Sequence, residues 1–272
     1  ARSSDVHKGL LAKELFVFFL LRLIGDWLDE SAGQRVEVMA CGMVGARQGW
    51  REAAYRPVPT PPLDAPFLTV VPQDARFHFH IVPGLSQAEP ADVMRGEETQ
   101  IAGFLAAMPN HVGVIGLPGT HMKWAQVADG QVRCFQTCMT GEVFALLSGQ
   151  SVLRHGLGMG WDASAFAAAV AEVYDAPEAL PRALFGLRAG GLLGRLTPDA
   201  ARARLSGLLI GAELAATRAI RQDSPITLIG AGPLAENYRH ALAIVGQDAA
   251  LADAEAVTLA GLIEAYQMLQ GA

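Results

Sequence analysis

The sequence predicts an α/β protein, because short apolar runs typical of strands alternate along the chain with segments of helical pattern. Strand-like runs lie at 36–41, 77–82 and 225–229, and three more lie between residues 112 and 138, where turn residues predict a hairpin that continues into a third strand. The chain has 272 residues and 51% hydrophobic content, so it can bury a large core.

Helical patterns fill the stretches between these strands. They cover residues 10–30, 92–108, 140–155, 162–174, 198–219, 233–245 and 253–269. We expect Asp92 to be the N-cap or a first-turn acid of its helix. Gly207 and Gly211 share one helix face and would let another backbone approach closely. The apolar run at 15–21 is too short to span a membrane and is interrupted by Arg22, which favours a buried helix.

Charge and cysteine content exclude several function classes. A net charge of −6 argues against a general nucleic-acid binder, although a few well-placed donors could still bind a small anion. Cys41, Cys134 and Cys138 match neither a disulfide framework nor a zinc site, which favours a reducing cytoplasm. The histidines show no metal-ligand spacing, and we interpret His78 and His80 as strand-surface residues, so no metal ligands are assigned.

Two glycine-bearing turns could contact phosphate. Residues 226–242 read as strand, glycine turn and helix, with the turn formed by Gly230, Ala231 and Gly232. Such a turn can present backbone N–H groups to a phosphate, or it can be a plain tight connection. The dinucleotide fingerprint is absent, because Ala235 occupies the third glycine position. At the hairpin mouth, Gly119, Thr120, His121 and Lys123 likewise suit either a phosphate or an ordinary turn.

Acids and arginines supply candidates for catalysis and substrate binding. Glu97 and Glu98 lie early in a predicted helix beside Arg95, where a carboxylate could act as a general base or could simply complement the helix dipole. A glycine-bearing loop, "CGMVGARQGW", offers three further candidates, Arg47, Gln48 and Trp50. An arginine there could bind a carboxylate with its two-pronged guanidinium, or could be an ordinary surface residue.

Together and in order, these segments resemble the 2-dehydro-3-deoxygalactonokinase family of sugar-acid kinases. The matching stretches include "CGMVGARQGW", "MRGEETQ", "LPGTHMKW", "LSGLLIGAEL" and "GAGPLAENY", and the resemblance covers about residues 36–242. It implies membership of the sugar kinase, actin and Hsp70 superfamily, whose fold has two ribonuclease-H-like lobes around a nucleotide cleft. The implied lobes are residues 1–108 on the sugar-acid side and 109–272 on the ATP side.

The resemblance also implies roles for individual residues. Glu97 is the first candidate for the catalytic base and Glu98 the second. The second phosphate hairpin comprises Gly119, Thr120 and His121 with Lys123, and the adenosine motif comprises Gly230, Ala231 and Gly232. The sugar acid is expected near Arg47, Gln48 and Trp50, with Arg47 or Arg95 binding its C1 carboxylate.

The implied reaction transfers the γ-phosphoryl group of ATP, with Mg²⁺, to the C6 hydroxyl of a 2-keto-3-deoxy sugar acid. The implied partners are these small molecules, with no nucleic acid or membrane, in the cytoplasm, and a homodimer is a candidate assembly. The motifs leave open which of the galactonate and gluconate epimers is the substrate. An exopolyphosphatase-like hydrolase and a non-catalytic nucleotide-binding module are the alternatives.

One departure from the family concerns the N-terminus. The family opens with a first phosphate loop of Asp-x-Gly-Thr-Thr type, which nothing in residues 1–35 matches, whereas "ARSSD" resembles the segment that follows it. We therefore expect upstream residues to be missing from this sequence. An intact mass of 28.8 kDa for the purified protein would contradict that expectation.

Overall fold

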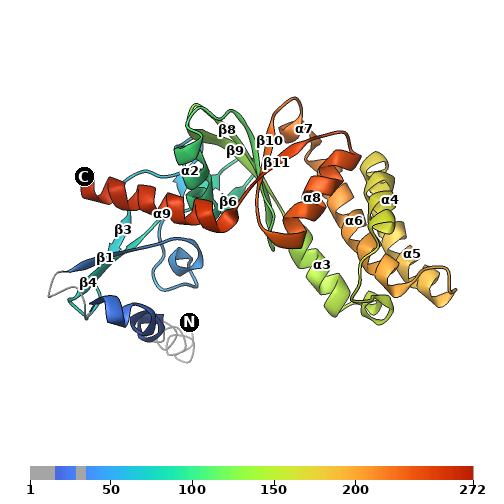
Figure 1. Cartoon of the computed structure of the whole chain (residues 1–272), viewed down its shortest axis with the longest axis horizontal. Coiled ribbons are helices and arrows are strands. Elements are labelled where there is room, and N and C mark those ends of the chain that lie inside the picture. Colours follow the sequence, from blue (N-terminus) through green and yellow to red (C-terminus); the bar gives the residue numbers. More distant parts are fainter. Residues whose placement is uncertain (1–15, 29–34, 272) are drawn as a thin grey trace. The chain divides into compact units, whose positions relative to one another are not determined.

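The computed structural model describes residues 16–28 and 35–271, which form a mixed α/β fold (Figure 1). The chain divides into two compact units. Unit 1 contains the described residues up to Asn110, the short segment Gly130–Val132 and the C-terminal helix from Glu255 onward. Unit 2 contains His111–Asp129 and Arg133–Ala254. The segment "ARSSD" lies outside the described residues, as does part of the helix predicted at 10–30, whose residues 16–28 are helical.

Unit 1 is built on a three-stranded sheet in the order β1-β4-β3. Strand β1 (Val36–Ala40) runs parallel to β4 (Phe77–Ile81), which pairs antiparallel with β3 (Leu68–Val70). Apolar side chains on one face of this sheet pack against the helix at 16–28. The other face lies toward α9 (Ala254–Gly271), because the Met39 and Cys41 side chains pack in the same apolar cluster as residues of that helix.

A second, smaller sheet leads into the helix that carries the paired glutamates. It has the order β2-β5-β6, and its strands are Arg56–Pro57, Leu85–Gln87 and Asp92–Met94. Helix α2 (Glu97–Ala107) follows it. The predicted helix start at Asp92 is therefore wrong. Residues 92–94 pair with β5 instead, and Gly96, with φ of 105°, turns the chain into the helix as its N-cap.

Helix α2 packs closely on α9 through two glycines. A Cβ atom at Gly103 would lie 1.9 Å from the carbonyl oxygen of Val257, and one at Gly261 would lie 2.0 Å from that of Thr99. Any side chain at either position would force the two backbones apart. The C-terminal helix is thus an integral part of unit 1, whereas the predicted lobe of residues 109–272 included it.

Unit 2 is built on a five-stranded sheet in the order β11-β10-β7-β8-β9. These strands are Ala249–Ala252, Ile226–Ile229, Gly113–Leu117, Met122–Ala128 and Gln131–Cys138. Strand β7 runs parallel to β10 and antiparallel to β8, which confirms the predicted hairpin. The buried side chains of β8 and β10 form a core with helices of the same unit.

The helices of unit 2 gather around a long central helix, α6 (Figure 1). They are α3 (Thr140–Gly149), α4 (Ala163–Asp175), α5 (Leu180–Leu192), α6 (Pro198–Ala216), α7 (Arg218–Arg221) and α8 (Gly232–Ile244), with short 3₁₀ turns at Val152–Gly156 and Pro177–Ala179. The predicted close approach at Gly207 and Gly211 is confirmed, because Cβ atoms there would lie 2.5 Å and 2.6 Å from carbonyl oxygens of α4. Helix α5 was not predicted.

Helix α5 was missed because Pro181 suggested a break in the pattern. Proline is tolerated in the first turn of a helix, where its missing N–H is not needed, and Pro181 lies in the first turn of α5.

Among residues 16–28 and 35–271, no helix is both long and apolar enough to cross a membrane.

Candidate functional site

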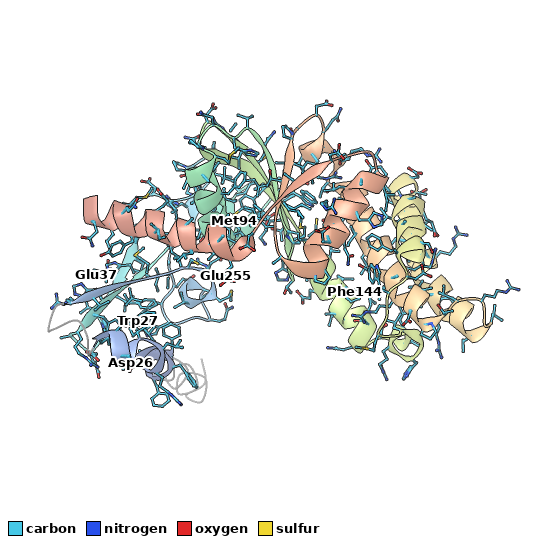
Figure 2. The ribbon with its side chains drawn as sticks, in the orientation of Figure 1. Asp26, Trp27, Glu37, Met94, Phe144 and Glu255 are labelled. Atoms are coloured by element: carbon cyan, nitrogen blue, oxygen red, sulfur yellow. The ribbon has the colours of Figure 1, made fainter. Side chains whose placement is uncertain are left out.

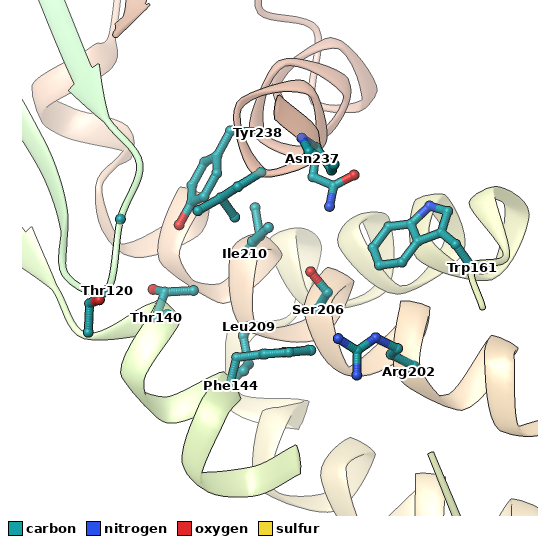
Figure 3. A pocket seen from close by; sticks show the side chains of 14 residues that line it. Thr120, Thr140, Phe144, Trp161, Arg202, Ser206, Leu209, Ile210, Asn237 and Tyr238 are labelled. Carbon is teal, nitrogen blue, oxygen red and sulfur yellow. The ribbon is translucent and has the colours of Figure 1, made fainter. Parts of the chain in front are cut away.

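Unit 2 contains a hollow of about 450 Å³ beside the β7–β8 turn (Figure 3). The turn contributes Gly119 and Thr120, and the start of α3 contributes Thr140 and Gly141. Helices α6 and α8 supply much of the remaining wall, from which the Arg202 guanidinium and the Asn237 amide point inward (Figure 3). The volume lies in the range of small-molecule sites.

The β7–β8 turn is fixed against the start of α3. The backbone N–H of Glu142 donates to the Thr120 carbonyl oxygen at 2.9 Å, and the His121 Nε2 lies 2.5 Å from a Glu142 carboxylate oxygen. A Cβ atom at Gly141 would lie 2.4 Å from the carbonyl oxygen of Gly119, so only glycine allows this approach. The turn and the positive end of a helix dipole thus meet at the hollow, which favours an anion there.

A buried carboxylate supports the wall of this hollow from behind. Glu213 on α6 is 5% exposed and accepts hydrogen bonds from Trp124 Nε1 at 2.8 Å, from the Tyr238 hydroxyl at 2.8 Å and from the Thr140 hydroxyl. Burial raises the pKa of the Glu213 carboxyl group. Burial, together with the neighbouring Glu213, also raises the pKa of the Tyr238 hydroxyl well above its ordinary value. Since Thr140 and Tyr238 also line the hollow, Glu213 fixes the orientation of two of its wall residues.

The predicted adenosine motif lies next to the hairpin turn. A Cβ atom at Gly230 would lie 3.6 Å from the Pro118 ring, and Gly232 has φ of 65°, in the left-handed region that favours glycine. The hollow is lined by Pro233 and Leu234 of α8, one residue further along, rather than by Gly230, Ala231 or Gly232.

Two of the predicted phosphate-binding side chains do not line the hollow. His121 is engaged by Glu142. Lys123 is 5% exposed on β8. The part of the predicted phosphate hairpin at the hollow is therefore Gly119 and Thr120.

In unit 1, both predicted base candidates fold back onto the chain before α2. A Glu97 carboxylate oxygen accepts from the backbone N–H of Arg95 at 2.9 Å. Glu98, whose side chain is fully buried, accepts from the backbone N–H of Gly96 at 2.6 Å and from the Thr99 hydroxyl at 3.1 Å. Burial raises the pKa of Glu98 to about 7, and the neighbouring Glu97 charge adds to this effect.

Two arginines of unit 1 have buried donors with no hydrogen-bond partner among the described residues: Arg95 Nη1, and Arg56 Nε and Nη1. Arg95 also donates through Nη2 to the Ala53 carbonyl oxygen at 2.6 Å and lies 4.2 Å above the Tyr55 ring. Arg56 donates through Nη2 to the Pro62 carbonyl oxygen at 2.8 Å. Buried donors are rarely left unsatisfied, so these atoms are candidates for binding an anionic ligand.

The charge on Glu98 acts on Arg56. Burial lowers the pKa of Arg56, while the charges of Asp64 and Glu98 act to raise it. Arg56 was not predicted as a site residue, because it stands just before a proline-rich stretch and belongs to no motif.

The three candidate residues of the loop "CGMVGARQGW" differ in their exposure to solvent. Arg47 and Gln48 are exposed. Trp50 is buried, and its ring centroid lies 5.0 Å from that of Phe16 and 5.0 Å from that of Phe79. The placement of Trp50 at the sugar acid stays a prediction: its ring packs in the aromatic core of unit 1, and Trp50 also lines a hollow of about 360 Å³ together with Gln48.

Known proteins match this chain over most of its length. The family model of 2-keto-3-deoxy-galactonokinase matches residues 2–265. A probable 2-dehydro-3-deoxygalactonokinase of Rhizobium meliloti is 38% identical over 255 residues, which are 91% of this chain and 83% of that protein. The 2-dehydro-3-deoxygalactonokinase of Escherichia coli is 36% identical over 249 residues, which are 89% of this chain and 81% of that protein.

A solved structure agrees with these matches. The crystal structure of a protein from Sinorhizobium meliloti, described as a putative 2-dehydro-3-deoxygalactonokinase, superposes with a TM-score of 0.83 at 36% identity. The match covers 91% of this chain and 84% of that chain. Sequence and fold thus agree over nearly the whole chain, and the protein belongs to the 2-keto-3-deoxy-galactonokinase family.

Proposed function

We propose that this protein transfers the γ-phosphoryl group of ATP to the C6 hydroxyl of 2-dehydro-3-deoxy-D-galactonate, giving 2-dehydro-3-deoxy-6-phosphogalactonate in galactonate catabolism. The observation that carries this conclusion is the family match over residues 2–265. The activity is that of a phosphotransferase with an alcohol as acceptor, and ATP and the sugar acid are its substrates.

We infer that ATP binds in the hollow of unit 2. The Thr120 turn and the start of α3 would contact its phosphates, and Asn237 and Leu234 of α8 would lie beside its nucleoside part. Mg²⁺ would accompany ATP and neutralise charge that develops on the transferred group. Mg²⁺ prefers oxygen ligands, and in this region the protein offers the Thr120 and Thr140 hydroxyls and the Glu142 carboxylate.

We infer that Glu98 is the base that accepts the proton of the acceptor hydroxyl, ahead of Glu97. A pKa of about 7 supports this order, because a general base works best with a pKa near the working pH. Arg56 and Arg95 would bind the substrate carboxylate, since both carry buried donors without a hydrogen-bond partner among the described residues, although Arg56 Nη1 lies 3.8 Å from an Asp64 carboxylate oxygen. This assignment moves the carboxylate contact from Arg47, which is exposed.

Three finer features are part of the proposal. We expect the two units to be ribonuclease-H-like lobes of the actin-like ATPase type, as the family resemblance implies. We expect the reaction to take place in the cytoplasm, where ATP is supplied, and we keep the homodimer as the assembly to be tested by light scattering.

An ATP-coupled assay tests the function. The full-length protein is given ATP, Mg²⁺ and either 2-keto-3-deoxy-galactonate or its gluconate epimer, and a parallel reaction contains polyphosphate alone. We expect phosphorylation of the galactonate epimer at the higher kcat/KM. Phosphate release from polyphosphate with no phosphorylation of either sugar acid would overturn the proposal.

A further inference from the structure

A cluster of three potential metal ligands lies on one face of the unit 1 sheet. It consists of Glu37 on β1 (Figure 2) and His78 and His80 on β4 and is called the Glu-His-His cluster below. Each residue offers a ligand atom, and these atoms all lie within 4.8 Å of one another. His78 Nδ1 is 3.2 Å from Glu37 Oε1, and His80 Nε2 is 2.5 Å from Glu37 Oε2.

The strand register produces this convergence. Side chains two positions apart on a strand share a face, so His78 and His80 point the same way. Glu37 is the direct cross-strand partner of His78, and Thr69 on β3 is that of His80. From local spacing the two histidines were predicted to be strand-surface residues, because the third ligand, Glu37, lies 41 positions from His78 in the chain.

We propose that the Glu-His-His cluster binds a divalent transition-metal ion, with Zn²⁺ as the best match. Two imidazole nitrogens and one carboxylate oxygen are a ligand set typical of zinc sites that leave a fourth position for water. Imidazole ligands disfavour Mg²⁺, which prefers oxygen, so this site is chemically different from the one expected with ATP. Glu37 and His78 are about one quarter exposed, which leaves a path for the ion.

The ligand atoms need to move little to enclose an ion. With metal–ligand bonds of about 2.0–2.2 Å, tetrahedral ligand atoms lie about 3.3–3.6 Å apart. These distances run to different oxygens of the Glu37 carboxylate: Oε1 lies 3.2 Å from His78 Nδ1, close to this range, and Oε2 lies 2.5 Å from His80 Nε2, which would have to open by about 1 Å. A single carboxylate oxygen would serve as the ligand, and the three ligand atoms already lie within 4.8 Å of one another. Side-chain rotation within the existing sheet is sufficient for such a change.

Thr69 completes the site as the partner of a ligand. Its hydroxyl lies 3.0 Å from His80 Nδ1. Without a metal, this hydroxyl can donate to Nδ1 while Nε2–H donates to Glu37. With a metal on Nε2, the proton moves to Nδ1, which then donates to the Thr69 oxygen. A second hydrogen bond of this kind orients most metal-ligating histidines.

Cobalt titration of the tag-free full chain, first stripped with a chelator, tests the proposal. We expect one equivalent of Co²⁺ to give the visible d–d spectrum of a tetrahedral site, and one equivalent of Zn²⁺ to abolish it. The variants Glu37→Gln and His78→Asn should each bind at least about 10-fold more weakly, and Thr69→Val about 10-fold more weakly. His155→Asn, which changes an exposed histidine outside the cluster, should bind as the unmodified protein does.

Three results would overturn the proposal. They are no saturable uptake of Co²⁺ or Zn²⁺, unchanged affinity in both Glu37→Gln and His78→Asn, and preferential uptake of Mg²⁺ or Ca²⁺. Circular dichroism and the unfolding midpoint in chelator must match between variants and parent, so that weaker binding reports lost ligands rather than a lost fold. Glu37→Gln keeps the side-chain shape, and it decides the matter if His78→Asn is unstable.

Discussion

Replacing Glu98 by glutamine should make the protein more stable at alkaline pH while removing its activity. The Glu98 side chain is fully buried, and its pKa is raised from 4.5 to about 7. The folded protein therefore keeps a proton that the unfolded chain releases, and stability falls as pH rises between these two values. Glutamine has the same shape and can still accept from the N–H of Gly96, but it cannot ionise.

The magnitude follows from the two pKa values. Each pKa unit corresponds to about 1.4 kcal/mol, so ionised Glu98 lowers the stability by about 3 kcal/mol at pH 8. At pH 5.5 the same group lowers it by only about 1 kcal/mol. The advantage of Glu98→Gln should thus grow by about 2 kcal/mol between pH 5.5 and pH 8.

Urea unfolding at both pH values measures this difference. The matched control is Glu89→Gln, an exposed glutamate of unit 1 whose replacement should change stability by less than about 0.5 kcal/mol at either pH. In the kinase assay, Glu98→Gln should lower kcat about 10²- to 10⁴-fold, and the kcat of the parent should rise through about pH 7 as Glu98 loses its proton. An advantage that is equal at both pH values would refute the reasoning about burial.

Three further substitutions test the other contacts. Arg56→Lys should raise KM for the sugar acid about 10-fold with KM for ATP unchanged, because lysine lacks the two-pronged donor; an equal rise for ATP would argue against the carboxylate role. Gly141→Ala, whose Cβ would lie 2.4 Å from the Gly119 carbonyl oxygen, should weaken ATP binding in calorimetry at least about 10-fold. Unchanged binding would show that the close contact between the start of α3 and the β7–β8 turn is not needed for ATP. Tyr238→Phe removes one donor from buried Glu213 and should cost about 1–3 kcal/mol in urea unfolding, and a neutral result would show that Glu213 does not need that donor.

The parts of the fold that depend on local signals were predictable. The β10 strand, the glycine turn and helix α8 follow one another within residues 226–244, and each has its own local pattern. The start of α2 was not predictable in this way. Asp92 looks like a helix cap by itself, but its segment pairs with β5. Strand pairing depends on distant residues, and a local reading cannot include it.

In the candidate site, too, residues within local motifs were predictable, whereas a residue that depends on distant partners was not. Glu97, Glu98 and the Gly119 turn stand out through their motifs. Glu213 does not, because one of its donors, Trp124, lies 89 positions away in the chain. A glutamate within the otherwise apolar "LSGLLIGAEL" is the signal that could have revealed it, since a buried carboxylate must find donors.

The glycine contact between α2 and α9 has a consequence for the order of folding during synthesis. Unit 2 is nearly continuous in the chain, so it can form once residue 254 has left the ribosome. Unit 1 is discontinuous, and the helix bearing Glu97 and Glu98 lacks its partner until α9 is made. A nascent chain should therefore acquire the proposed nucleotide-binding unit first, and unit 1, with the proposed base, should mature only once α9 has been made.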